Sequence, residues 1–240
     1  MGSMPTSPED VRVLVTGFGP FREQYPVNPS WEIVARLPDF LPAGRVKNHA
    51  HQSSRGLPPV RIIKLAEPVR VCYNVVRPLA PKLWDDPQYG MDYCVHIGMA
   101  GPQLVYSLER QGHRDGYAQK DVDGELLDDE KRHAEEGEDW IWHGVPKTLL
   151  TDLDVGDVHK RWVARSPCTS NLRVSEDAGR YLCDFIYMSS LAHLWKQQRR
   201  RNVVFLHVPL HSDEQSITRG VELVLNLIRS LVESELEKKS

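Results

Sequence analysis

The chain has 240 residues, of which 40% are hydrophobic and 26% charged, as in ordinary globular proteins. Its 30 basic and 33 acidic side chains give a net charge of −3. Because no positive excess is present to neutralise phosphates, we expect no nucleic-acid partner. No apolar stretch approaches the length of about 18 residues that spans a bilayer, so we expect no membrane association either.

The cysteines and the N-terminus indicate the compartment and the domain organisation. The 4 cysteines show no CxxC spacing and are sparse for a disulfide-rich secreted scaffold. We therefore expect reduced thiols and a cytoplasmic location. Residues 1–10 are interpreted as a disordered N-terminus or a cloning remnant, and residues 11–240 as a single α/β domain.

Expected strands and helices alternate along the chain. Val11–Phe18 is rich in β-branched residues and predicts a buried first strand. Later patterns predict strands over 60–65, 92–98 and 202–209, and helices over 30–37, 71–84, 175–198 and 214–233. Residues 38–59 are expected to be irregular, and the polar residues 111–139 to form an extended surface loop over a cleft. This order indicates a three-layer α/β/α sandwich around a mostly parallel, twisted sheet.

Ligands of such sheets bind where strands end and loops begin. The turns after the expected strands contain Gly17-Phe18-Gly19, Gly98-Met99-Ala100-Gly101 and His207-Val208-Pro209. None of them is a P-loop, a complete dinucleotide fingerprint or a G-x-S-x-G nucleophile elbow. We therefore expect no nucleotide-type cofactor.

Two histidine pairs have spacings that could hold a metal ion. His49 and His51 lie among prolines, and His207 and His211 are separated by Pro209. A zinc site needs a third protein ligand, which the sequence does not point to. We expect no metal.

A cysteine, a histidine and a glutamate have an order that suits nucleophilic catalysis. Cys183 lies in the N-terminal half of the helix that Ser175 is expected to start. A thiol near the positive end of a helix dipole and beside a histidine ionises well below its free pKa of about 8.5. His207 ends the next expected strand, and Glu109 could orient its ring. The spacing alone also allows a packed thiol, a core histidine and a surface ion pair of Glu109 with its neighbour.

Several short blocks of the chain resemble, in the same order, the pyroglutamyl peptidase I family. They are Val13–Phe21 with Asn28-Pro29-Ser30-Trp31, then Gly98-x-Ala100-Gly101 leading to Glu109-Arg110, then Val174–Cys183, and finally His207-Val208-Pro209. The resemblance extends over essentially the whole chain. An ordered set of blocks is far more specific than any one of them.

This resemblance implies a cysteine exopeptidase that removes an N-terminal pyroglutamyl residue from blocked peptides. It implies a triad of Glu109, Cys183 and His207 that acts through a thioacyl-enzyme without metal or cofactor. It also implies that Phe18 and Phe21 sandwich the pyrrolidone ring, although both could equally be core residues. The remaining side chains implied at the substrate site are Asn28, Met99 and Leu182.

The chain departs from the family pattern around this site. Arg22-Glu23 follows Phe21 where the family usually has glycines, Met99 stands where glutamine is common, and Asp184 follows the cysteine in place of asparagine. The stretch 111–145 lacks a usual arginine and carries extra residues. These departures leave open a catalytically weak or inactive paralogue that binds a small molecule or a peptide. A nucleoside phosphorylase-like enzyme is a further alternative, and the oligomeric state is left open.

Overall fold

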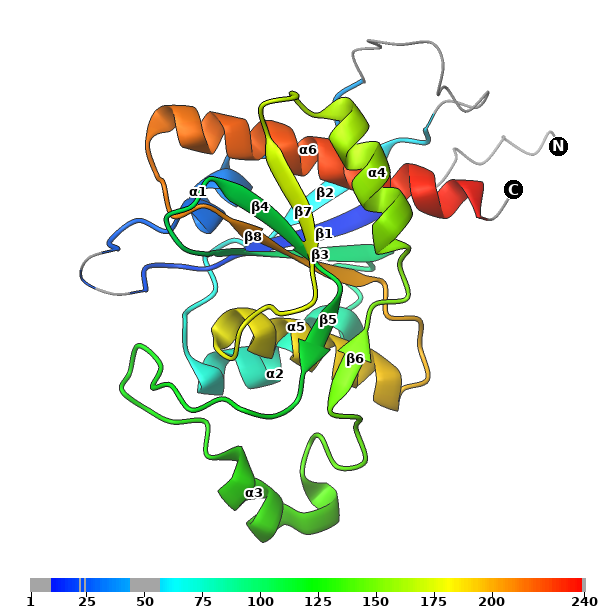
Figure 1. Cartoon of the computed structure of the whole chain (residues 1–240). Helices are drawn as coiled ribbons and strands as arrows, with labels where there is room; N and C mark the ends of the chain where they lie inside the picture. Colours follow the sequence, from blue (N-terminus) through cyan, green and yellow to red (C-terminus); the bar gives the residue numbers. More distant parts are fainter. Residues whose placement is uncertain (1–9, 22, 24, 44–56, 239–240) are drawn as a thin grey trace, which may run out of the picture.

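The computed structural model describes residues 10–21, 23, 25–43 and 57–238, and its fold is drawn in Figure 1. The interpretation of the first nine residues therefore lies outside the described residues, as do His49 and His51. Within the described part, no helix is long and apolar enough to cross a membrane.

A six-stranded sheet of order β2-β1-β3-β8-β4-β7 forms the centre of the molecule. Its strands are β1 (Val11–Gly17), β2 (Val60–Lys64), β3 (Tyr93–Met99), β4 (Val105–Glu109), β7 (Asn171–Ser175) and β8 (Val203–Val208). Neighbours from β2 to β8 are parallel, whereas β4 runs antiparallel to β8 and parallel to β7. The central strands are nearly continuous apolar runs because both faces of the sheet are covered.

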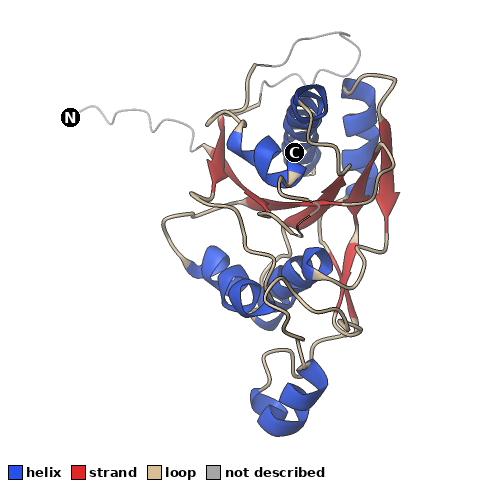
Figure 2. Ribbon diagram, turned by 90° about the vertical axis from the view of Figure 1, so that its left-hand side faces the viewer, coloured by secondary structure: helices blue, strands red, loops and turns tan. Residues whose placement is uncertain are grey.

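Helices cover the two faces of the sheet (Figures 1 and 2). One layer contains α1 (Pro29–Ala35), α4 (Val155–Arg165) and α6 (Glu214–Glu237), and the other contains α2 (Tyr73–Asp85) and α5 (Leu182–Lys196). Side chains alternate along each strand, so Val13 and Val15 pack in the first layer and Leu14 in the second. The expected three-layer sandwich around a mostly parallel sheet is confirmed.

Two helix starts differ from the expectation. The helix expected from Ser175 begins at Leu182, and residues 171–175 form the edge strand β7 instead. Ser175 Oγ accepts a hydrogen bond from Asp177 N, and Gly179 takes φ +82°, so the chain turns before the helix starts. The first helix is capped by Asn28, whose side chain accepts from Ser30 N, and not by Ser30 itself.

The stretch expected as a surface loop over 111–139 has secondary structure of its own. It contains β5 (Gln111–His113), α3 (Asp129–Glu136) and a 3-10 turn over Gly137–Asp139, and β5 pairs with β6 (Thr148–Leu150). Trp140 and Trp142, which follow, are buried against the layer of α2 and α5. The expectation of an extended loop was therefore wrong where β5, α3 and the 3-10 turn form, whereas most of the stretch is exposed, as expected of a surface segment.

A polar cluster is enclosed between β3 and α5. The ring of His96 hydrogen-bonds Thr16 Oγ1 at 2.8 Å and Ser190 Oγ at 2.9 Å and is completely buried. Burial lowers the pKa of His96 from 6.5 to about 3, because an imidazolium at this position would lose its hydration. The unfolded chain therefore takes up this proton first as the pH falls, and folding stability is lost below about pH 6.5.

We expect His96→Gln to reduce this acid sensitivity. The wild-type free energy of unfolding should fall relative to that of the variant by about 2 kcal/mol between pH 7 and pH 5, at about 1.4 kcal/mol per unit below the unfolded pKa. Urea unfolding of both proteins at the two pH values measures the difference. His143→Gln, at an exposed histidine, is the matched control. A difference between wild type and His96→Gln that stays constant over this range would contradict the assignment.

Candidate functional site

Residues from three neighbouring strands meet at one edge of the sheet. Gly98 of β3 lies beside His207 of β8, and the antiparallel β4 places Ser107 opposite His207 and Glu109 opposite Phe205. Because side chains two residues apart share a face, Glu109 and His207 both project toward the layer that contains α5. The unpredicted strand β4 therefore brings Glu109 to the histidine.

Glu109 and His207 form a buried pair. His207 Nδ1 lies 2.8 Å from Glu109 Oε1, and the glutamate is only 1% exposed. The other carboxylate oxygen, Oε2, is buried without a hydrogen-bond partner among the described residues. Arg110, the neighbour in a possible surface ion pair, contacts Glu176 at 3.1 Å instead. The surface role considered for Glu109 is therefore wrong.

Cys183 is the second residue of α5 and is half-buried. The hydroxyl of Tyr181, at the N-cap position, donates to Lys120 O and does not cap the helix. The first backbone N–H groups of a helix have no partner within it, so they give this end a positive potential. Since the helix starts later than expected, the thiol lies directly in that field.

Gly98 allows the sulfur to approach the sheet. A Cβ atom at this position would lie 2.7 Å from Cys183 Sγ and 2.7 Å from the ring of Phe205. Such separations are well inside van der Waals contact, so a larger residue would displace the thiol or the ring. The glycine noted at the end of the third expected strand thus makes room for the sulfur beside His207.

His207 carries a strongly perturbed imidazole. Burial alone lowers its pKa, but a hydrogen bond with Cys183, the charge of that sulfur and the Glu109 carboxylate act against burial. Together they raise the pKa of His207 from 6.5 to about 10. The ring is therefore an imidazolium at neutral pH, between two acceptors, and it can deliver a proton in this site.

The side chains implied at the substrate site fall into two groups. Phe18 is only 3% exposed and packs in the core beneath the loop. Asn28 is also buried: its amide donates to Gly19 O at 2.9 Å, and its oxygen accepts from Ser30 Oγ at 2.8 Å. Both residues thus brace the turn after β1. Met99, at the end of β3, is half-buried.

Phe21 and Tyr181, the residue before the first residue of α5, form an aromatic pair. Their ring centroids lie 5.5 Å apart, and both side chains are partly buried against the α2 and α5 core. Leu182 is 1% exposed within that core, so it supports the site from behind. Sequence reasoning missed Tyr181, because a helix assumed to start at Ser175 would not mark it as the cap residue next to the thiol.

No histidine cluster with metal-ligand geometry is found among the described residues. His211 Nε2 lies 3.0 Å from Pro102 O and does not join His207. The only group whose ligand atoms converge there is Cys72, Asp121 and Asp123. Asp121 already accepts hydrogen bonds from the backbone N–H groups of Asp123 and Glu125 in its own loop and of Tyr73 at the start of α2, and Asp123 pairs with Arg70. These contacts account for the cluster as a loop support.

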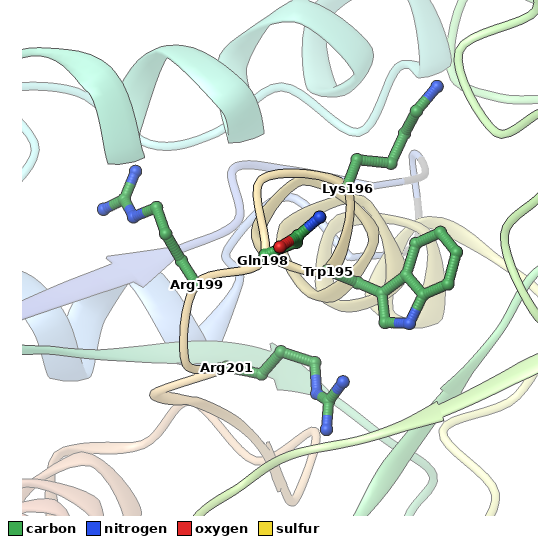
Figure 3. Close-up of a pocket in the computed structure, with 5 residues that line it drawn as sticks. All are labelled: Trp195, Lys196, Gln198, Arg199 and Arg201. Carbon is green, nitrogen blue, oxygen red and sulfur yellow. The ribbon is translucent and has the colours of Figure 1, made fainter.

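A separate hollow lies at the other end of α5. It has a volume of about 430 Å³ and is lined by Trp195, Lys196, Gln198, Arg199 and Arg201 (Figure 3). At 1.5 Å per residue it is about 18 Å along the helix from Cys183. Arg199 contacts Asp85 and Arg201 contacts Asp152, so these cations fasten the end of α5 to its neighbours. The hollow is therefore not part of the Cys183 site.

The chain is similar to peptidases from animals and archaea. It is 32% identical over 198 residues to pyroglutamyl-peptidase 1 of Mus musculus, which covers 82% of this chain and 78% of that protein. It is 27% identical to the pyrrolidone-carboxylate peptidase of Thermococcus onnurineus, over 95% of this chain and 100% of that protein. No family model matches the chain.

A solved structure shares the fold. The pyrrolidone carboxyl peptidase of Pyrococcus furiosus superposes with a TM-score of 0.67 at 22% identity, covering 95% of this chain and 99% of the other. At this level of identity the likeness concerns the fold. The 32% identity to the mouse protein is evidence of family membership as well as of a shared fold, and it confirms the resemblance seen in the ordered sequence blocks.

Proposed function

The chain belongs to the pyroglutamyl-peptidase I (pyrrolidone-carboxylate peptidase) family, and on this premise we propose that it removes pyroglutamate from the N-termini of peptides. The observation that carries the proposal is the pairing of a buried Glu109–His207 couple with a cysteine at the uncapped start of a helix. This arrangement places a sulfur nucleophile, Cys183, and an acid, the imidazolium of His207, within one site.

In the proposed reaction, Cys183 Sγ attacks the carbonyl carbon of the pyroglutamyl residue as a thiolate. The imidazolium of His207 gives its proton to the departing amine, the C–N bond breaks, and a thioacyl-enzyme remains. Water then loses a proton to His207 and attacks the thioester carbon. The C–S bond breaks, and pyroglutamate leaves with Cys183 and His207 restored to their starting states.

Two further groups support the charges of this reaction. Glu109 would hold the ring of His207 and stabilise its positive charge through the 2.8 Å contact. The backbone N–H of Cys183, with a neighbouring N–H at the start of α5, would stabilise the oxyanion. These donors are fixed by the helix, so they need no reorganisation during the reaction. The chemistry requires no metal and no cofactor.

Specificity would come from an uncharged, ring-sized site. We infer that the paired rings of Phe21 and Tyr181 supply flat apolar walls for the substrate ring, with Met99 at the end of β3 and Phe18 and Leu182 packed in the core. A blocked terminus carries no ammonium group, whereas a free amine would have to lose its hydration there. We propose substrates that are N-terminally pyroglutamyl-blocked peptides, and a reducing compartment such as the cytoplasm to keep Cys183 active.

The alternative, an inactive paralogue that only binds its ligand, is not favoured. The relatives above are named as peptidases, and the charged pair of Glu109 and His207 is retained beside the thiol. Burying such a pair without a catalytic use would cost stability for no gain.

A fluorogenic assay tests the proposal. The wild-type protein should release aminomethylcoumarin from its pyroglutamyl conjugate at least about 100-fold faster than from the prolyl conjugate, which has a charged amine in a ring of the same size. The ring analogue 2-pyrrolidone should slow both turnover and alkylation of Cys183 by iodoacetamide. Protection from alkylation without any turnover would identify a binding protein and overturn the proposed activity.

A further inference from the structure

A buried acid lies directly beside the proposed nucleophile. Asp184 follows Cys183 in the first turn of α5, and its side chain is completely buried. Its Oδ1 accepts from the backbone N–H of His113 at 3.2 Å, with the Nδ1 of the same residue at 3.4 Å. Its Oδ2 lies 3.0 Å from the hydroxyl of Tyr117. These contacts connect β5 and the following loop to the start of the helix.

The hydroxyl group of Tyr117 has two oxygen neighbours but only one proton, so it cannot donate to both His113 O and an ionised Asp184. The Tyr117 hydroxyl lies 2.5 Å from His113 O and 3.0 Å from Asp184 Oδ2, and it has one proton to give. A carbonyl oxygen can only accept, so the shorter contact uses the tyrosine proton. The contact with Asp184 is then a hydrogen bond only if the carboxyl group supplies its own proton. Oδ1 remains free to accept from His113.

We propose that Asp184 is held as a neutral carboxylic acid that donates to Tyr117, so that it fastens segment 111–117 to the first turn of α5 without placing a negative charge beside Cys183. Its importance for catalysis rests on the proposed function. Its protonation state does not.

The groups that face Asp184 are consistent with a neutral acid. Burial raises the pKa of Asp184, and His113, Tyr117 and Arg180 oppose that rise without cancelling it. The guanidinium of Arg180 is 3.9 Å away and is engaged by Asp177 at 2.7 Å. In the first two turns of α5, the other titratable groups are Cys183 and Tyr187, and neither offers Asp184 a positive partner; His193 and Lys196 lie in the last turn of the helix.

A neutral Asp184 preserves the electrostatic field that the thiolate needs. The positive potential at a helix start is strongest in its first turn. An ionised carboxylate in that turn would partly neutralise this positive potential, and it would repel the negative charge on the sulfur and on the oxyanion. Asp184 is therefore a positioning residue, because it fastens segment 111–117 to the first turn of α5 and leaves the field to Cys183.

The pH profile of alkylation distinguishes the two states of Asp184. If Asp184 is neutral, Asp184→Asn replaces one uncharged donor by another, and the rate of iodoacetamide reaction at Cys183 should follow the wild-type pH profile within about 0.3 units. If Asp184 is ionised, the same variant removes a like charge and shifts the profile to lower pH by about one unit or more, which would overturn the proposal. Glu176→Gln, at an exposed and ion-paired glutamate on the preceding loop, is the control for the change in net charge.

Removing the hydroxyl of Tyr117 gives a second test with opposite outcomes. The ¹³C resonance of the Asp184 carboxyl group, assigned by its loss in Asp184→Asn, should titrate above the usual range of an aspartate in the wild type, because burial raises its pKa. In Tyr117→Phe the midpoint should fall, because the neutral acid loses its acceptor. A rise in the midpoint would mean that Tyr117 donates to a carboxylate, and the proposal would be wrong. Neither readout uses turnover, so a failure of the proposed activity remains distinguishable.

Comparing kcat of two Asp184 variants distinguishes a positioning role from general damage to the fold. Asp184→Ala should lower kcat for the pyroglutamyl conjugate by about tenfold, and Asp184→Asn should restore it to within about twofold of wild type, since asparagine keeps the donor and the acceptor. Equal losses in both variants would mean that the carboxyl group acts through its charge.

Discussion

Cys183→Ala is expected to lower kcat for a pyroglutamyl conjugate by at least about 10⁴-fold, because the variant lacks the sulfur that would form the acyl-enzyme. The unfolding midpoint should change little, since the half-buried side chain contributes only a small apolar surface. The His207 pKa of about 10 should also fall in this variant, because a hydrogen bond and a charge from Cys183 help to raise it. Progress curves, urea unfolding and an NMR titration of the imidazole measure the three effects.

The exposed Cys168 provides the matched control for this substitution. Cys168→Ala also removes one thiol but should leave kcat and the pKa of His207 at their wild-type values. If Cys183→Ala kept a tenth or more of the wild-type kcat, the nucleophile would have to be another group, and the family relationship alone would support the activity.

Glu109→Gln is expected to lower kcat by about 10³-fold while leaving the fold intact. The amide keeps the shape of the side chain but removes the negative charge 2.8 Å from His207 Nδ1. The pKa of His207 should fall, so fewer molecules carry the imidazolium at neutral pH, and the alkaline limb of the rate profile should move to lower pH. Measuring kcat between pH 6 and pH 10 gives both the loss and the direction of the shift.

Stability should change far less than activity in the Glu109→Gln variant. Glu109 is almost fully buried, and its Oε2 has no hydrogen-bond partner among the described residues, so its charge is costly to hold. Gln removes this cost together with the favourable pairing to His207, and the two effects oppose each other, so the free energy of unfolding should stay within about 1 kcal/mol of wild type. Glu222→Gln, on the exposed face of α6, should alter neither quantity. A full loss of activity with a matching loss of stability would mark Glu109 as structural.

The sequence predicted which residues form the candidate site but not how the fold brings them together. Cys183, His207 and Glu109 were named because ordered blocks of sequence resembled a family, and the structure brings these side chains into one cluster. The spacing of these residues could not establish that cluster. Glu109 reaches His207 because β4 pairs with β8, and this is the antiparallel pairing of a sheet whose other neighbours are parallel. Local sequence patterns contain no information about this order of strands.

The aromatic residues of the site show a second property that the sequence could not predict, namely which of them is buried in the core. Phe18 and Phe21 have equal claims in the sequence, yet one is a core residue and the other lies partly exposed against Tyr181. The sequence also suggested a helix start at Ser175, where a serine and acidic residues satisfy the local rules for a cap. The left-handed turn at Gly179 and the edge position of β7 override those rules.

The sequence by itself determined the near-neutral charge and the alternation of strands and helices, because these depend on composition and on short-range periodicity. It also contained the ordered blocks that resemble the peptidase family. Only the tertiary structure decided which strand follows which in the sheet, where α5 begins, and which groups enclose the carboxyl group of Asp184. Such properties depend on groups that are far apart in the chain and are buried together. Burial changes both the geometry and the charge that each group can hold.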